Sequence, residues 1–190
     1  MKKMRFTKHL AGFTLIEIVI GIGVFILILF ALFNLYLTYG SLYTLQQARL
    51  TAISRARAAM SEITLLTLQA RRVAGNVTIG TTTYYSNTTT MALQLPAITS
   101  GGGIISNTWD YVVFYSNGEN LYRTTQADGS SYRVSETKLI TNNLQSISFT
   151  YDNADLILAQ KVTINIITQS QDARHTATSS LNTQLNLRNF

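Results

Sequence analysis

A single carboxylate, Glu17, stands near the start of an apolar run that continues to Phe33 and, past Asn34, to Leu37. A charged side chain costs about 2.5 to 3.5 kcal/mol at the centre of a membrane helix. A carboxylate at this place therefore needs an interfacial position or a partner. Its chemistry would be charge pairing with a cationic partner.

A second candidate for chemistry is the segment YDNAD, residues 151–155. Its Asp152, Asn153 and Asp155 could offer oxygen ligands to Ca²⁺. The run lacks the length and the glycine pattern of a known calcium loop, so a solvated turn is the favoured interpretation. The sequence leaves calcium binding there open, and we expect no resident cofactor or metal.

Catalytic side chains have little support in this sequence. The two histidines are His9 and His175, and His175 lies in the polar segment DARHTAT. Nothing in the chain places a serine and an aspartate beside it, as a hydrolytic triad would need. Cysteine is absent, which excludes disulfides, thiolate metal sites and a cysteine nucleophile. We therefore expect that the chain is not an enzyme.

The apolar run that holds Glu17 is long enough for one membrane span. Residues 18–33 contain no charged or strongly polar side chain, and the extension to Leu37 is interrupted only by Asn34. A helix of about 20 residues is about 30 Å long, which is the thickness of the hydrocarbon core of a bilayer. The sequence thus predicts one transmembrane helix.

The charge distribution predicts the orientation of this span. The net charge is +6, residues 1–12 supply +4 of it, and no basic residue follows the span before Arg49. By the positive-inside rule the N-terminus is cytoplasmic and the chain beyond the span is exported. The remaining +2 argues against nucleic-acid binding. Five arginines on the predicted helix keep it as an alternative, although a solvated face or contacts to neighbouring subunits are favoured: Arg49, Arg55, Arg57, Arg71 and Arg72.

A cleavable leader is predicted in front of the span. In an ordinary secretory signal the small residues of the cleavage site follow the apolar core, whereas here Ala11 and Gly12 precede it. A cut at this point removes the basic residues 1–12 and leaves the membrane helix on the mature protein.

The stretch GFTLIEIVIGIGVFILILF, residues 12–30, closely resembles the class III signal of type IV prepilins and type II secretion pseudopilins. The resemblance implies cleavage between Gly12 and Phe13 by a prepilin peptidase, N-methylation of the new Phe13 amine, and an assembly role for Glu17. We expect Glu17 to pair with the Phe13 amine of a neighbouring subunit, because an ion pair in an apolar filament core favours one axial offset. The alternative is that Glu17 only extends to the membrane interface.

The helical pattern persists beyond the span. We predict one helix from Phe13 to about Arg72, roughly 90 Å long, with Gly75 as its left-handed cap. It divides into a transmembrane half, residues 13–39, and an amphipathic half, residues 40–75. The amphipathic half carries apolar residues at spacings of three and four: Leu42, Leu45, Ala48, Ala52, Ala56, Met60, Ile63, Leu66 and Ala70.

Residues 76–190 are predicted to form a β-rich globular domain. NVTIGTTTYYSNTTT and PAITSGGGIISN, residues 76–90 and 96–107, predict an exposed, mobile connection because Thr, Asn, Gly and the only proline punctuate them. The turn NG between WDYVVFYS and ENLYRTT predicts one hairpin, and the turn DNAD between LQSISFTY and LILAQKVTINIIT predicts another. With the last run, TATSSLNTQLNL, the predicted fold is α+β and pilin-like: a long N-terminal helix packed on an antiparallel β-sheet.

Four later segments, NLYRTT, NNLQSISFTYDN, KVTINIIT and LNTQLNLRNF, resemble J-type minor pseudopilins and W-type minor pilins. The resemblance implies a structural subunit of a type IV pilus or a type II secretion pseudopilus, at or near the filament tip, that primes assembly. Its expected partners are other pilin or pseudopilin subunits, the prepilin peptidase, the membrane assembly platform and membrane lipid.

The expected location is the bacterial cytoplasmic (inner) membrane, with a single span and the globular domain outside, followed by a periplasmic or cell-surface filament. The alternatives are a major pilin of the shaft and an adhesive or DNA-uptake competence pilin. The sequence does not distinguish a secretion machine from a twitching or competence machine.

Overall fold

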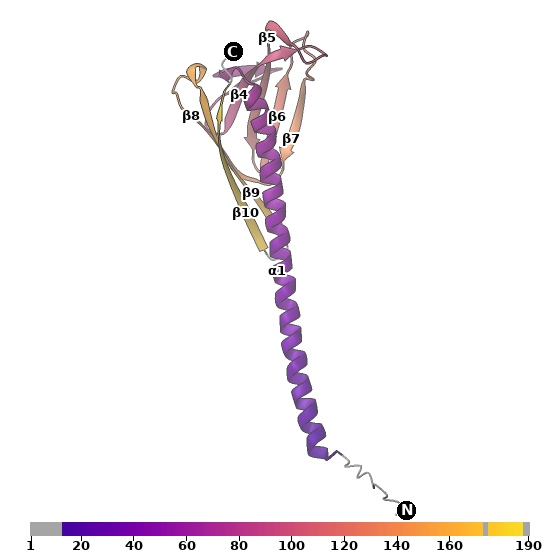
Figure 1. Ribbon diagram of the computed structural model, residues 1–190. Coiled ribbons are helices and arrows are strands. Elements are labelled where there is room, and N and C mark those ends of the chain that lie inside the picture. The colour runs from indigo at the N-terminus through magenta and orange to yellow at the C-terminus, as the bar shows by residue number, and fades with distance from the viewer. Residues whose placement is uncertain (1–12, 173–174, 188–190) are drawn as a thin grey trace, which may run out of the picture. The chain divides into compact units, whose positions relative to one another are not determined.

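The computed structural model describes residues 13–172 and 175–187, and the chain divides into two compact units, residues 1–43 and 44–190. The helix α1 (Leu15–Gln69) contributes to both units (Figure 1). The predicted leader, residues 1–12, lies outside the described residues. The other elements belong to the second unit: β1 (Arg72–Ala74), β2 (Asn76–Ile79), β3 (Thr82–Tyr85), β4 (Thr90–Ile98), β5 (Ile104–Asn117), β6 (Asn120–Gln126), β7 (Glu136–Thr141), β8 (Leu144–Tyr151), the 3₁₀ helix η1 (Leu156–Leu158), β9 (Lys161–Asp172) and β10 (His175–Asn186).

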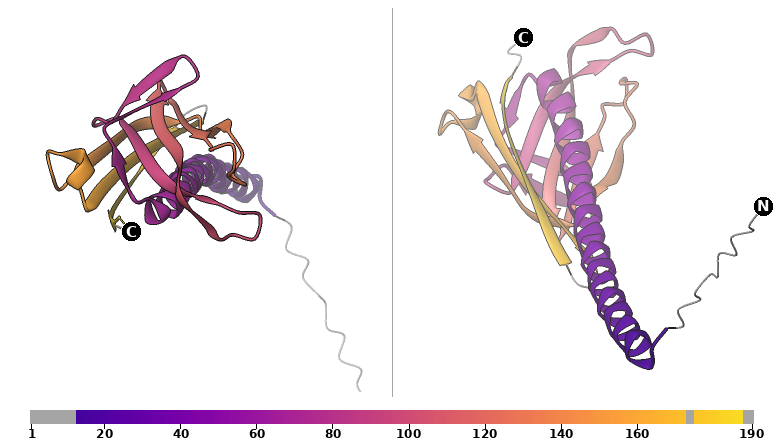
Figure 2. Two further views of the ribbon diagram at one scale, coloured as in Figure 1. Left: turned by 90° about the horizontal axis from the view of Figure 1, so that it is seen from above. Right: turned by 60° about the horizontal axis from the view of Figure 1, so that its bottom comes forward.

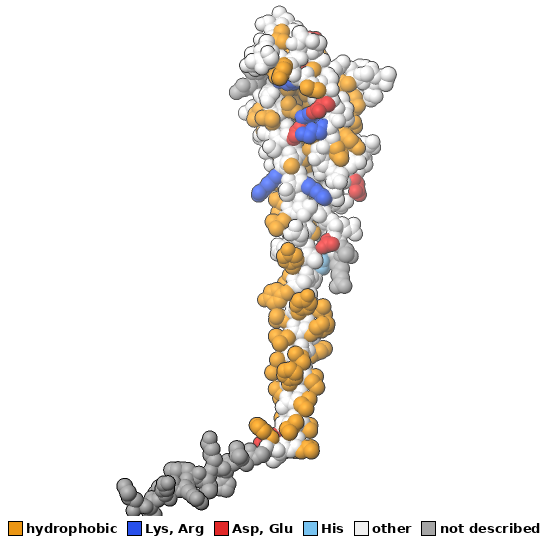
Figure 3. Space-filling model, turned by 90° about the vertical axis from the view of Figure 1, so that its right-hand side faces the viewer, with side chains coloured by type: hydrophobic (Ala, Val, Ile, Leu, Met, Phe, Trp, Pro, Cys, Tyr) orange, Lys and Arg blue, Asp and Glu red, His pale blue; other side chains and the backbone are white. Residues whose placement is uncertain are grey.

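The first unit is the apolar part of α1. Its large hydrophobic side chains are exposed in the isolated chain, from 49% for Leu29 to 84% for Phe13, and Figure 3 shows them along this segment. The amide of Asn34 donates to the carbonyl of Phe30 at 2.9 Å, so the polar interruption is satisfied within the helix. By length and composition this part of α1 could cross a membrane.

The second unit contains three antiparallel sheets. The strand order is β1-β4-β5-β6-β7 in the largest, β10-β9-β8 in the next, and β2-β3 in a separate hairpin. Figure 2 shows the two larger sheets from two further directions. The α+β class and the packing of a long helix on antiparallel sheets are therefore confirmed.

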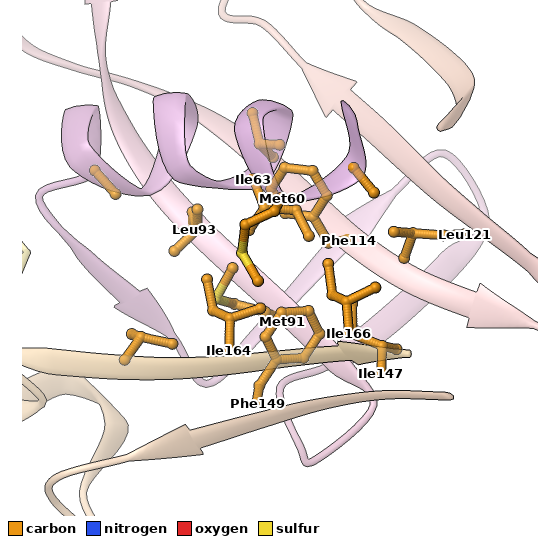
Figure 4. Packing of buried hydrophobic residues seen from close by; sticks show 14 of the residues in the cluster. Met60, Ile63, Met91, Leu93, Phe114, Leu121, Ile147, Phe149, Ile164 and Ile166 are labelled. Carbon is orange, nitrogen blue, oxygen red and sulfur yellow. The ribbon is translucent and has the colours of Figure 1, made fainter. Parts of the chain in front are cut away.

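The core of this unit lies where the second half of α1 packs against both larger sheets. Figure 4 shows Met60 and Ile63 of α1 facing Phe114 of β5. The same view shows Phe149 of β8 and Ile164 of β9, from the three-stranded sheet, on the other side of this core. Each large side chain buried in this way contributes roughly 1.5 to 3 kcal/mol to stability. Four alanines of α1 are at most 4% exposed: Ala48, Ala52, Ala56 and Ala59.

These small residues allow strands to approach the helix closely. The hydroxyl of Thr168 in β9 donates to the backbone carbonyl of Ala52 at 2.7 Å. Such a bond to a helix carbonyl is possible only where short side chains leave the backbone accessible. The predicted apolar stripe is confirmed from Ala48 to Ile63, whereas Leu42 is 50% exposed.

The predicted end of the helix is wrong. The structure ends α1 at Gln69, so that Arg72 lies in β1, and Gly75 follows that strand and caps no helix. β1 pairs with β4, and its Val73 is fully buried in the core. The tertiary pairing of this short strand overrides the local cap signals.

The prediction of a mobile connection is also wrong for most of residues 76–107. Residues 76–85 form the β2-β3 hairpin, and Pro96 lies within β4. Proline is tolerated there because β1 pairs only with the Ala92–Gln94 part of β4, and the register with β5 shifts just after Pro96. The Pro96 carbonyl accepts a bond from Arg133 at 2.5 Å.

The two predicted hairpins are confirmed. β5 and β6 meet at the pair Asn117 and Asn120, and Gly118 adopts a φ of +60°, which the tight turn requires. β8 pairs with β9, although residues 156–158 form η1 rather than the start of the strand. The last predicted strand is β10. Five of the strands are not predicted from the sequence: β1, β2, β3, β4 and β7.

Candidate functional site at the start of the helix

The N-terminus of α1 is held by a reciprocal pair of side chains, Thr14 and Glu17. The backbone N–H of Thr14 donates to Glu17 Oε2 at 2.8 Å, and the Thr14 hydroxyl donates to the same oxygen at 3.0 Å. In return, the backbone N–H of Glu17 donates to Thr14 Oγ1 at 3.4 Å. This is the capping box, in which residues at the N-cap and N3 positions satisfy each other's backbone groups.

This arrangement assigns Glu17 a role within its own chain. The first N–H groups of a helix lack intrahelical partners, and their positive end favours a nearby carboxylate. Glu17 therefore satisfies donors that an apolar surrounding would leave unpaired. Sequence reasoning missed this role, although its signal, a threonine three residues before a glutamate at the start of an apolar run, is present in TLIE.

The predicted processing residues are located only in part. Phe13 directly precedes Thr14 and is 84% exposed, whereas Gly12 lies outside the described residues. Oxygen Oε2 of Glu17 holds the cap, and Oε1 has no partner in the described part of the chain. The predicted pairing of Glu17 with a neighbour's Phe13 amine stays a prediction, and the second oxygen is available for it.

The candidate calcium segment is occupied by local hydrogen bonds. Asp152 Oδ1 accepts from the backbone N–H of Gln160 at 2.9 Å and of Lys161 at 3.1 Å. These bonds, above all the one from Lys161, lower the pKa of Asp152. Asn153 accepts from Asp155 within the turn, and Asp155 in turn caps η1.

The oxygens of this segment thus stabilise a turn, which supports the solvated-turn interpretation. Among residues 13–172 and 175–187, no group of three or more His, Cys, Asp or Glu side chains could hold a metal ion. His175 is the first residue of β10 and lies opposite Asp172 in the register of β9 and β10.

The five arginines do not share one helix. Arg49, Arg55 and Arg57 lie on α1, but Arg71 and Arg72 follow its end. The Arg71 guanidinium stacks over Trp109, 4.5 Å from the ring centroid, and Arg72 donates to Gln94. This separation weakens the alternative of a basic helical stripe for DNA.

Two charged clusters join the second half of α1 to the largest sheet. In the first, Glu62 of α1 pairs with Arg123 of β6 and with Lys138 of β7, and Arg123 also pairs with Glu136. These partners are far apart in sequence, so no local pattern in the chain predicts them.

The second cluster surrounds Asp110 of β5, which is fully buried. Arg133 pairs with Asp110 at 2.7 Å and also donates to Gln69 at the end of α1. Two further donors complete the shell of this carboxylate: the Asp128 N–H at 2.8 Å and the Ser131 hydroxyl at 2.7 Å. The cluster fixes the segment between β6 and β7 against the sheet.

The chain was also compared with known proteins. No protein-family model matches it, and no curated protein or solved structure is significantly similar to it.

Proposed function

We propose that the chain is a membrane-anchored structural subunit of the pilin and pseudopilin class, a minor subunit at or near a filament tip that primes assembly. The observation that carries the proposal is the first unit: an apolar helix, exposed on all sides, that starts at a capping box directly after the predicted cleavage position. A helix that is hydrophobic all round must be buried in lipid or among other helices. A filament subunit uses both environments in turn.

Glu17 supports the proposal because its two oxygens can serve two partners. Oε2 is engaged by Thr14, and Oε1 remains available as an acceptor. A neighbour's protonated Phe13 amine, released by leader removal, would supply a charge-assisted bond to it. Axial register in the filament would then depend on cleavage.

The second unit supplies the surface that distinguishes this subunit from others. The apolar core and the two charged clusters hold the second half of α1 on the sheets. We infer that the unit lies outside the cytoplasmic membrane and contacts other pilin or pseudopilin subunits, while the assembly platform acts on the helix. The proposed role is non-catalytic.

Leader removal is tested by mass spectrometry of the full chain, expressed with and without a prepilin peptidase. The expected product has lost residues 1–12 and carries one methyl group on Phe13. Replacement of the small residue at the junction, Gly12→Val, should block the cut. A product cut after the apolar run, or no cut in the presence of the peptidase, would contradict the proposal.

Assembly is tested with Glu17→Val in cells that build the filament. This variant should insert in the membrane at the normal level but be depleted about tenfold or more from sheared filaments, because a charge-assisted contact is lost. Glu119→Gln, which removes an exposed carboxylate of the second unit, is the matched control and should assemble normally. Normal assembly of Glu17→Val would refute the pairing.

Abundance separates the minor subunit from the main alternative. A major pilin would dominate the protein in sheared filaments, whereas a tip subunit should be a small fraction of it. Deletion of the gene, scored for protein secretion, surface piliation and DNA uptake together, identifies the machine.

A further inference from the structure

A cavity of about 380 Å³ opens on the second unit beside β1, β4 and β5. It lies on the face of the largest sheet opposite the main core, because its lining residues Ala74 and Tyr111 belong to the smaller cluster around Val77 and Val113. Its volume is in the range of pockets that hold small molecules, about 300 to 1,000 Å³. The proposed filament role does not use this cavity.

Arg72, on the wall of this cavity, is held in place by a buried amide. Arg72 of β1 lies directly opposite Gln94 of β4, and its Nε donates to Gln94 Oε1 at 2.6 Å. Gln94 is 4% exposed, and its Nε2 donates to the hydroxyl of Tyr111 at 3.3 Å. Both sides of the amide are engaged, so the guanidinium is oriented before any ligand arrives.

The cavity presents hydrogen-bond donors that have no partner within the described residues. Within the described residues, neither terminal nitrogen of Arg72 has a partner, and the Asn76 side chain has none. The Tyr111 oxygen accepts from Gln94, which leaves its hydrogen for another acceptor. No acidic residue is among the described lining residues, which leaves the positive charge of Arg72 uncompensated.

We propose that this cavity binds a small polyhydroxylated carboxylate, of the uronic acid class. The two terminal nitrogens of a guanidinium match the two oxygens of a carboxylate. The Tyr111 hydroxyl and the Asn76 amide can bond sugar hydroxyls, and Ala74 and Ile157 offer an apolar wall for the C–H face of a ring. This site is independent of the helix and of filament assembly.

The test is calorimetric titration of the full chain in detergent micelles with four probes: glucuronate, glucose, acetate and inorganic phosphate. Glucuronate should bind at least about tenfold more tightly than glucose, which lacks the charge, and than acetate, which lacks the hydroxyls. Phosphate should also be weaker, because it can bind the guanidinium but lacks the sugar ring and hydroxyls that would contact Tyr111 and Asn76. Equal binding of glucose or of phosphate would overturn the carboxylate assignment, and so would the absence of glucuronate binding.

Variants locate the binding in this cavity. Arg72→Gln should weaken glucuronate binding about tenfold or more. Arg72→Lys should weaken it too, since a single ammonium group cannot bond both carboxylate oxygens as the two terminal nitrogens of the guanidinium do. Arg71→Gln is the matched control, because Arg71 is engaged on Trp109, and its affinity should stay within about twofold. Asn76→Ala, at an exposed position, keeps the test valid if the Arg72 variants unfold, and it should weaken glucuronate more than acetate. Unchanged affinity in folded Arg72→Gln or in Asn76→Ala would overturn the proposal.

Discussion

Asp110, the buried carboxylate of β5, should be a residue whose truncation strongly destabilises the second unit. Its side chain is 0% exposed, and that of its partner Arg133 is 13% exposed. Asp110→Ala leaves the Arg133 guanidinium without its carboxylate, although its bonds to Pro96 and Gln69 remain, and leaves the Asp128 N–H without its acceptor. Breaking a buried pair by removing one partner costs about 3 to 5 kcal/mol, because the remaining charge is uncompensated.

The size of the effect can be converted into an observable shift. With a urea slope of about 2 kcal/mol per molar, a loss of 3 kcal/mol lowers the unfolding midpoint by about 1.5 M. The assay is urea unfolding of the full chain in detergent, followed by fluorescence of Trp109. This is the only tryptophan, and it directly precedes Asp110 in β5.

A double-mutant cycle separates the ion pair from general damage. Arg133→Leu alone should also be strongly destabilising, because it leaves the Asp110 carboxylate without its cation. Asp110→Ala combined with Arg133→Leu should cost less than the sum of the two single variants. Glu119→Gln, at the exposed β5-β6 turn, should change stability by less than about 0.5 kcal/mol. A loss below about 1 kcal/mol for Asp110→Ala at an unchanged slope, or strict additivity in the cycle, would refute the reasoning.

Three further perturbations follow from the packing, from the helix cap and from the β8-β9 turn. Ala52→Leu should destabilise the second unit by about 1 to 3 kcal/mol in the same urea assay, because Ala52 is fully buried where Thr168 approaches the helix. Ala58→Leu, at an exposed position of the same helix, should change the unfolding free energy little. Equal effects of the two substitutions would contradict the packing. Thr14→Val should accelerate hydrogen exchange of the Glu17 backbone amide, because valine lacks the side-chain oxygen that accepts this N–H, whereas Thr14→Ser keeps that oxygen and should not. Equal exchange rates in the two variants would contradict the cap. The pKa of Asp152 is lowered in the folded chain by backbone donors, chiefly the N–H of Lys161. Its contribution to stability is therefore present above the unfolded pKa of about 3.9 and is lost as pH falls through the folded pKa. Asp152→Asn should flatten the dependence of the unfolding free energy on pH in that acid range, and an unchanged dependence would contradict this assignment.

Local patterns in the sequence were sufficient to predict the helix and several strands. An apolar run without proline, which only Asn34 interrupts, specifies the first half of α1. Apolar residues at spacings of three and four specify the face that its second half buries. The turn at Gly118 could likewise be predicted from the sequence, since few residues besides glycine adopt its φ of +60°. The threonine and glutamate of the capping box are also a local signal, so that part of the candidate site could have been found.

The remaining features depend on residues that only folding brings together. Val73 forms part of a strand because β4 lies beside it. Pro96 is accepted in β4 because β1 begins only at Arg72, opposite Gln94, and does not extend as far as Pro96. The carboxylate of Asp110 is buried among donors from a segment that follows it by about 20 residues, and the Arg72 guanidinium is oriented by an amide on another strand. Helical periodicity and turn preferences involve only a few neighbouring residues, so they can be predicted from local sequence. Ion pairs, cavity walls and the boundaries between helices and strands depend on long-range contacts, which local sequence does not specify.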